Sequence, residues 1–387
     1  MAEGATETVT SPLARGYRPW FDGVRAVGLA MVLVQHTIGT LPVDIGSIGL
    51  AAFFALSGYL ITGLLLDERA ADGSVSLRGF YLRRAARLVP AVVLVVVVCD
   101  LLFIIAGDLA PLPGSLAALT YTANYALILD SDFVLGFGPT WSLAVEEHFY
   151  LLWPLVLLGI TRRWGLRGAL WATLAICVTA MFWRGVLALL AAPINLIDIG
   201  SFERADSMLY GCAAAIAVRL GWRPRGWMFF AGVALYVLTL FATNGHAFAF
   251  AVVGSAALAI VSAAMIVCLD YAAAPWIRRA LSLRVLVTLG ILSYGVYLWH
   301  GPAMRLVADF GLPGPGWRGV AAVASIGIAA LSHRYVEMPI RIWGRQKADA
   351  MDDRRRGTPI AELQERFMLD RPLGGVQPEG APGQGKA

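Results

Sequence analysis

Long apolar runs constrain this chain more than any other feature of its sequence. A helix that crosses a lipid bilayer needs about 17–25 predominantly apolar residues. Hydrophobic residues make up 58% of the chain, above the share that is usual in soluble domains. The sequence therefore predicts an all-α polytopic membrane protein with about ten transmembrane helices, at 24–43, 47–66, 88–107, 140–160, 168–190, 205–220, 227–243, 247–269, 284–305 and 317–336.

Arginine residues gather in alternate connections between these runs. They are dense before the first run, after every even-numbered run and at the C-terminal side, and nearly absent from the loops between. By the positive-inside rule, this alternation places both termini in the cytoplasm. It also accounts for the net charge of +5 without nucleic acid as a partner. We expect a multi-pass protein of the cell membrane (inner or plasma membrane), with the lipid bilayer as a partner and the oligomeric state left open.

Three regions are predicted along the chain: a cytoplasmic N-terminal segment at 1–23, a transmembrane bundle at 24–343 and a polar, largely disordered cytoplasmic tail at 344–387. Residues 1–20 are polar, so no removable signal peptide is expected. An outer loop at 108–139 is rich in proline and glycine and is long enough to cover a site. No soluble catalytic domain is recognisable, so the bundle itself is expected to perform any chemistry.

The first run carries a histidine, His36, and ten residues separate it from Arg25. On a helix this spacing corresponds to about 16 Å along the axis, which puts a guanidinium at one interface and an imidazole halfway across or further. Ionisable groups inside a membrane are costly and usually serve function. A structural role in helix–helix contact is the alternative.

Two adjacent carboxylates, Glu146 and Glu147, lie near the start of the fourth run. With that run directed inward, their depth is comparable to that of His36. A carboxylate that accepts the Nδ1 proton of a histidine makes its Nε2 a general base. His36, Glu146 and Glu147 are therefore the candidate catalytic residues. Neighbours on a helix point about 100° apart, so only one glutamate can face His36, and His148 is a weaker candidate.

A second cluster consists of Arg83, Arg84 and Arg87 at the mouth of the third run, with Arg25 expected at the same interface. Arginine clusters bind phosphate groups through paired hydrogen bonds. For any one of these arginines, plain membrane topology is the competing explanation.

A small pair, Ser57-Gly58, lies in an aromatic setting in the second run and is expected to allow close helix packing or the passage of an acyl chain. Further residues are predicted to line a substrate passage or to pack around it: Trp141, Tyr150, His300 and Glu337. The four cysteines are predicted to be small buried residues, and no metal-ligand spacing is present.

Several segments in order along the chain resemble the membrane-bound acyltransferase-3 family of bacterial O-acyltransferases. The resemblance rests on the motifs FDGVRAVGLAMVLVQH, FFALSGYLIT, FYLRRAARLVP, TWSLAVEEHFYLLWP, RADSMLYG, SYGVYLWH and YVEMP. The family's Arg-x10-His pair falls on Arg25 and His36, and its arginine run on Arg83, Arg84 and Arg87. The chain departs from the family at His148, where members commonly have glutamine. A second, extracytoplasmic hydrolase-like domain, present in some relatives, is not expected within this polypeptide.

The resemblance implies transfer of an acyl group, usually acetyl, from cytoplasmic acyl-CoA to an acceptor hydroxyl, with no metal cofactor. The acceptor class stays open among sugars, glycolipids and other cell-envelope or small-molecule acceptors. Carbohydrate O-acetylation with His36 as general base is the leading hypothesis. The alternative is a proton-coupled exporter in which His36, Glu146 and Glu147 relay protons. A glycosyltransferase with a lipid-linked donor is a third possibility.

Overall fold

Helices account for the regular structure of the part of the chain that the computed structural model describes, residues 17–356 apart from 40, 42–43, 243–249, 310 and 312–313, and no strand occurs there. The helices are α1 (Pro19–Ile38), α2 (Ile45–Asp72), α3 (Leu77–Ala106), α4 (Leu112–Leu119), α5 (Ala123–Leu129), α6 (Trp141–Leu189), α7 (Ile194–Ile199), α8 (Ala205–Arg219), α9 (Trp227–Ala242), α11 (Ser255–Tyr271), α12 (Pro275–Leu281), α13 (Arg284–Asp309), α14 (Pro315–Ser332) and α15 (Met338–Arg356). Shorter helical turns are Ser131–Val134, Gly138–Thr140, Phe250–Gly254 and His333–Glu337.

The predicted all-helical character is confirmed, because each of the ten predicted runs falls largely on helix. By length and composition, five described helices are able to cross a membrane, or six if the bent pair of α12 and α13 forms one span. The count of ten spans and the cytoplasmic position of the termini remain predictions.

The fourth and fifth predicted runs belong to one long helical stretch, α6. A straight helix of its 49 residues would be about 73 Å long, more than twice the apolar thickness of a bilayer. It is broken at Gly165, whose φ of 65° and ψ of −170° are not helical. A positive φ is easily adopted by glycine, so this residue allows the chain to change direction where a loop was predicted.

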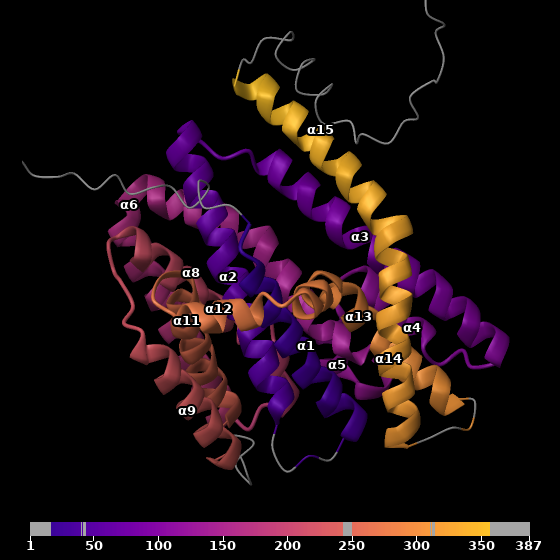
Figure 1. Cartoon of the computed structure of the whole chain (residues 1–387). Coiled ribbons are helices and arrows are strands. Elements are labelled where there is room, and N and C mark those ends of the chain that lie inside the picture. Colours follow the sequence, from indigo (N-terminus) through magenta and orange to yellow (C-terminus); the bar gives the residue numbers. More distant parts are fainter. Residues whose placement is uncertain are drawn as a thin grey trace, which may run out of the picture.

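The helices around the centre of the molecule come from distant parts of the chain (Figure 1). α1 packs between α2 and α13, and α2 packs against α8 and α11 on its other side. α3 contacts α13 and also runs beside the C-terminal helix α15. Because α1, α2, α3, α6 and α13 meet around the middle, side chains from five helices can face one space.

Two predicted boundaries differ from the structure. α1 begins at Pro19, inside the predicted N-terminal segment, because proline is well suited to a first helical turn. α15 extends to Arg356, so the predicted tail starts inside a helix that packs on α3, and residues 357–387 lie outside the described residues. The predicted outer loop contains α4 and α5, and its Val134 and Phe137 are buried in the bundle.

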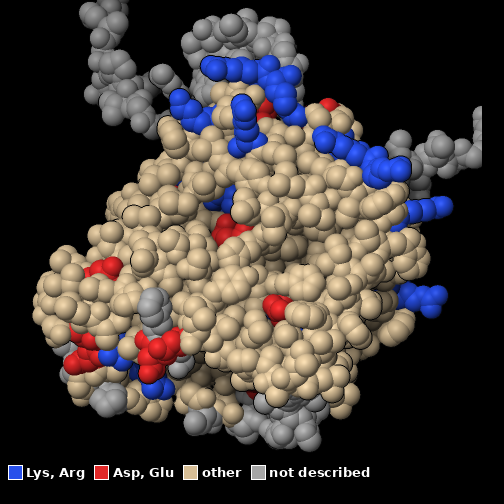
Figure 2. Space-filling model, turned by 180° about the vertical axis from the view of Figure 1, so that it is seen from behind, with Lys and Arg blue, Asp and Glu red and all other residues tan. Residues whose placement is uncertain are grey.

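Charged side chains lie mainly toward the ends of the bundle (Figure 2). Lys and Arg side chains lie along the upper and right edges in that view, acidic and basic side chains gather at the lower left, and the middle of the face is mostly uncharged with separate acidic patches. The arginine pattern predicts that certain helix ends share the cytoplasmic side. Two ion pairs join helix ends of this group, Arg18–Asp270 and Arg219–Asp67. At the other end Arg305 binds Asp108, 2.9 Å away. The four cysteines are buried and free, as predicted from their settings.

Candidate active site

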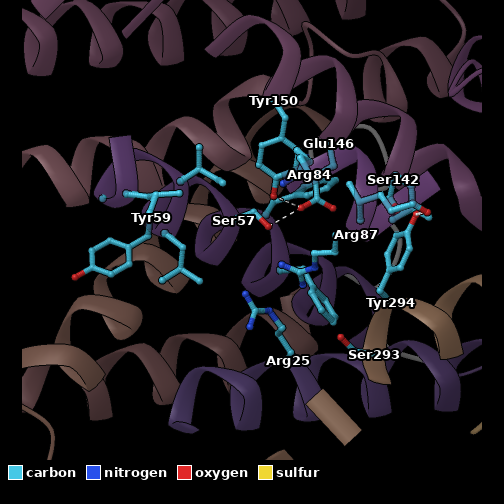
Figure 3. A pocket seen from close by; sticks show the side chains of 18 of the residues that line it. Arg25, Ser57, Tyr59, Arg84, Arg87, Ser142, Glu146, Tyr150, Ser293 and Tyr294 are labelled. Carbon is cyan, nitrogen blue, oxygen red and sulfur yellow. Dashed lines mark hydrogen bonds between the residues drawn. The ribbon is translucent and has the colours of Figure 1, made fainter. Parts of the chain in front are cut away.

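A cavity of about 350 Å³ lies between α1, α2, α3, α6 and α13 (Figure 3). Its lining is polar at several points despite its place inside an apolar bundle. The polar groups discussed below are those of Arg25, Arg84, Arg87, Ser57, Glu146 and Tyr297. Helices from distant parts of the chain therefore bring cations, carboxylates and hydroxyl groups to one space.

Among the described residues, five arginines line this cavity. Arg18 and Arg219 form the ion pairs given above, and the other three differ in their partners. Arg25 binds Asp22, one turn earlier on α1, at 2.6 Å. Arg84 binds Glu147 through two nitrogens, at 2.8 and 3.3 Å, and lies against the ring of Tyr150. Arg87 has no ion pair or hydrogen bond with any described residue, although it faces the cavity. The side chain of Arg87 is exposed, with no described carboxylate at ion-pair distance.

Arg83 does not join this group, contrary to the prediction from its shared face with Arg87. Its guanidinium lies 2.7 Å from Asp352 and 3.4 Å from Asp349, both on α15. The side chain therefore fastens the C-terminal helix to α3, and it does not line the cavity. The sequence did not indicate that α15 would supply carboxylates here.

Glu146 is bound by two hydroxyl groups. Ser57 Oγ donates to its Oε1 at 2.6 Å, and the phenol of Tyr150, one turn further along α6, donates to the same oxygen. Glu147 points to Arg84, on a different face of α6. The predicted contact of a glutamate with His36 is therefore absent, since both carboxylates bind other partners.

His36 contacts a second histidine instead. Its Nδ1 lies 2.8 Å from Nε2 of His300 on α13, and the two rings stack with an angle of 7° between their planes. His300 is fully buried, and its Nδ1 lies 2.6 Å from the carbonyl oxygen of Tyr297. His36 itself is exposed, and it lies in the last turn of α1.

Tyr297 connects the cavity with the histidine pair. Its side chain lines the cavity, its hydroxyl lies 2.8 Å from Ser142 Oγ, and its ring packs against His300. Ser142 and Tyr297 are in contact, and α6 and α13 run in opposite directions from this point. Glu146 lies one turn beyond Ser142 on α6, and His300 lies one turn beyond Tyr297 on α13. At 1.5 Å rise per residue, about 10 Å along the bundle separates the carboxylate from the imidazoles.

The other predicted residues have packing roles in the structure. A Cβ on Gly58 would overlap the carbonyl oxygen of Met208, so this glycine allows α2 and α8 to touch. Trp141 packs edge to face on Phe54, with ring centroids 6.5 Å apart. Glu337 is buried and accepts a hydrogen bond from Ser332 at 2.7 Å. Arg334, one turn before Glu337, lies over the ring of Tyr335.

Tyr294 and Tyr297 are cavity residues that sequence reasoning missed. A signal was present, because Tyr294, Tyr297 and His300 recur every three residues in SYGVYLWH and therefore share one side of α13. An apolar helix that presents two hydroxyls and an imidazole on one side indicates a polar site inside the bundle.

Comparison with known proteins agrees with the motif resemblance. A family model described as "Acyltransferase domain" matches residues 18–334. No solved structure matches the chain.

Several curated relatives match most of the chain. The peptidoglycan O-acetyltransferase OatA of Listeria monocytogenes is 32% identical over 86% of this chain. The putative peptidoglycan O-acetyltransferase YrhL of Bacillus subtilis is 29% identical over 85%, and the O-acetyltransferase OatA of Staphylococcus aureus is 28% identical over 84%. The chain spans only 55–57% of the length of these relatives.

Proposed function

Because the chain belongs to the acyltransferase-3 family, we propose that it is an integral membrane O-acyltransferase that uses acyl-CoA as the donor. The acyl group is acetyl, by analogy with the O-acetyltransferases to which the chain is similar. The acceptor is a hydroxyl group of a cell-envelope glycan, since two of the relatives are named as peptidoglycan O-acetyltransferases.

Arg87 is the observation that carries the donor assignment. It faces the cavity beside Arg25 and has no described anionic partner. Its side chain is exposed, so the guanidinium is accessible to an anion that enters the cavity, and guanidinium groups bind phosphate oxygens through paired hydrogen bonds. The phosphates of CoA are anions of this kind, so Arg25 and Arg87 would hold them at the arginine end of the cavity.

The size of the cavity fits part of the donor. A volume of about 350 Å³ is at the small end of pockets that bury a drug-sized ligand. We assign it to the acyl-pantetheine arm, with the thioester directed past Ser57 toward Tyr297. The adenosine part of the donor would then lie outside the cavity, at the arginine-rich end of the bundle.

His36 is the proposed general base. It lies beyond the Tyr297 end of the cavity, and its ring is exposed to a hydroxyl group that approaches from that side. Proton transfer from the acceptor to an imidazole produces the alkoxide that attacks the thioester carbonyl. The products are the ester of the acceptor and the free thiol, and no metal ion takes part in this scheme.

The exporter alternative has weaker support. A proton relay needs His36 and the carboxylates in hydrogen-bonded succession. Glu146 instead accepts hydrogen bonds from Ser57 and Tyr150, Glu147 pairs with Arg84, and His36 contacts His300. No specific observation favours a relay over acyl transfer.

The proposed base is tested by the transfer of label from [¹⁴C]acetyl-CoA to the glycan fraction of membranes that contain the protein. We expect His36→Ala to lower the rate by at least about 100-fold, within the range by which general base catalysis accelerates reactions. Thermal unfolding of the same variant, with an unchanged midpoint, controls for loss of fold. Transfer by His36→Ala at the wild-type rate would exclude His36 as the base.

A further inference from the structure

The hydrogen bonds of His300 determine where its protons lie. Its Nδ1 is 2.6 Å from the carbonyl oxygen of Tyr297, and a carbonyl oxygen only accepts hydrogen bonds. Nδ1 of His300 must therefore carry a proton. The remaining question is whether its Nε2 carries one as well.

A doubly protonated His300 is disfavoured by its surroundings. The side chain is 0% exposed, and its polar contacts among the described residues are with His36 and the backbone of Tyr297 and Val296, none of which bears a negative charge. Burial of a charge without a counter-ion is strongly unfavourable. His300 is therefore neutral, with a lone pair on Nε2.

The lone pair on Nε2 of His300 determines which nitrogen of His36 carries the proton. Nδ1 of His36 lies 2.8 Å from Nε2 of His300, so it must donate the hydrogen bond. We infer that His300 is a positioning residue, which holds His36 in the tautomer with a proton on Nδ1 and a free lone pair on Nε2. The stacked arrangement of the two rings, 5.1 Å between centroids, also restrains the orientation of the His36 imidazole.

The consequence for catalysis rests on the proposed function. Nε2 of His36 takes the proton of the acceptor hydroxyl, the acceptor oxygen attacks the thioester carbonyl carbon, and the carbon–sulfur bond breaks. The departing thiolate then receives the proton, which returns His36 to its neutral state. Throughout these steps Nδ1–H of His36 stays bonded to His300. A neutral imidazole thus has the orienting role that a carboxylate has in many hydrolases.

Nitrogen NMR of protein labelled with ¹⁵N-histidine in lipid bilayers tests the tautomer directly. The chain has five histidines, and loss of signals in His36→Gln assigns those of His36. We expect His36 to show a protonated Nδ1 and an unprotonated Nε2. A wild-type spectrum with the His36 proton on Nε2 overturns the inference, whether or not any variant folds.

Two variants of His300 separate orientation from packing. In His300→Leu the acceptor is lost, so the fixed tautomer should disappear and kcat for acetyl transfer should fall roughly 10- to 100-fold, with KM for acetyl-CoA unchanged. In His300→Gln the amide oxygen can accept the same hydrogen bond, and most of the rate should return. His333→Gln, in the short helical turn between α14 and α15 and outside the cavity lining, is the matched control with no change expected.

The outcomes distinguish this inference from the proposed function. If wild-type protein transfers acetyl groups but His300→Leu keeps its kcat, the positioning role is wrong and the enzyme assignment stands. If the Nδ1 tautomer is present but no acetyl transfer occurs from acetyl-CoA, the role of His300 in fixing the proton stands and the donor assignment fails.

Discussion

The pairing of each side chain decides which charges remain available for a ligand. Arg25 and Arg84 each have a carboxylate partner, whereas Arg87 has none among the described residues. Glu146 is bound by neutral hydroxyls, so it retains its own charge when ionised. The cavity thus contains the Arg87 guanidinium, which has no ion pair among the described residues, and the Glu146 carboxylate, which hydroxyl groups of α2 and α6 hold in place.

The Arg84–Glu147 pair yields a prediction about stability. The two side chains are 14% and 22% exposed, so they are largely but not completely removed from solvent. Loss of one member of a buried pair leaves an uncompensated charge, which costs about 3–5 kcal/mol when burial is complete. With the remaining exposure, we expect Arg84→Met to lower the free energy of unfolding by about 2 kcal/mol.

A double-mutant cycle checks the origin of that loss. Glu147→Leu combined with Arg84→Met removes both charges, so the double variant should be more stable than Arg84→Met alone. Denaturant unfolding in one detergent measures all four proteins. Additive losses in the double variant would contradict an ion pair as the cause.

Close helix approach through glycine is the main packing device at the element scale. Gly58 on α2 allows this helix to touch the backbone of α8 at Met208. The neighbouring residue on α2 is Ser57, which binds Glu146. An added methyl group has no room there, and overpacking costs about 1–3 kcal/mol. We expect Gly58→Ala to lower the midpoint of thermal unfolding in detergent.

Gly159 on α6 is the matched control for this substitution. A Cβ at Gly159 would have no neighbouring atom within 4 Å, and alanine is the better helix former. Gly159→Ala should therefore leave the midpoint unchanged or raise it slightly. Equal losses in the two variants would show that the α2–α8 contact is not the cause.

Helix location could be read from the sequence, but the ends of the helices could not. The apolar runs predicted where helices lie, since run length alone indicates them. The depth of His36 was estimated from a run at 24–43, whereas α1 ends at Ile38 and places His36 in its last turn. The expected contact with a glutamate is not made, because Glu146 and Glu147 bind other partners and His36 lies against His300.

Partners across helices were the other part that sequence reasoning missed. Glu146, Arg25 and Arg87 were predicted site residues that the structure brings to one cavity. Their contacts depend on how helices rotate about their axes and which ones are neighbours, and a one-dimensional pattern does not contain this information. Ser57 with Glu146, and His36 with His300, are contacts of this kind.

At the scale of the whole molecule, the cavity and the histidine pair lie one after the other along the bundle. Arg25, Arg87, Ser57 and Glu146 line the cavity, and Tyr297 lies between this cavity and the pair of His300 and His36. This order suits a donor that enters from the arginine-rich side and an acceptor that meets it from the other side. The central claim is that acyl-CoA binds at Arg25 and Arg87.

Equilibrium binding of radiolabelled acetyl-CoA to the purified protein in lipid nanodiscs tests that claim most directly. We predict saturable binding of one molecule per chain, about 10-fold weaker in Arg87→Met, because a charge-assisted hydrogen bond contributes about 1.5–3 kcal/mol. Arg83→Met, which removes a neighbouring arginine that is bound to Asp352, should bind as the wild type does. No saturable binding, or equal loss of affinity in the two variants, would contradict the account.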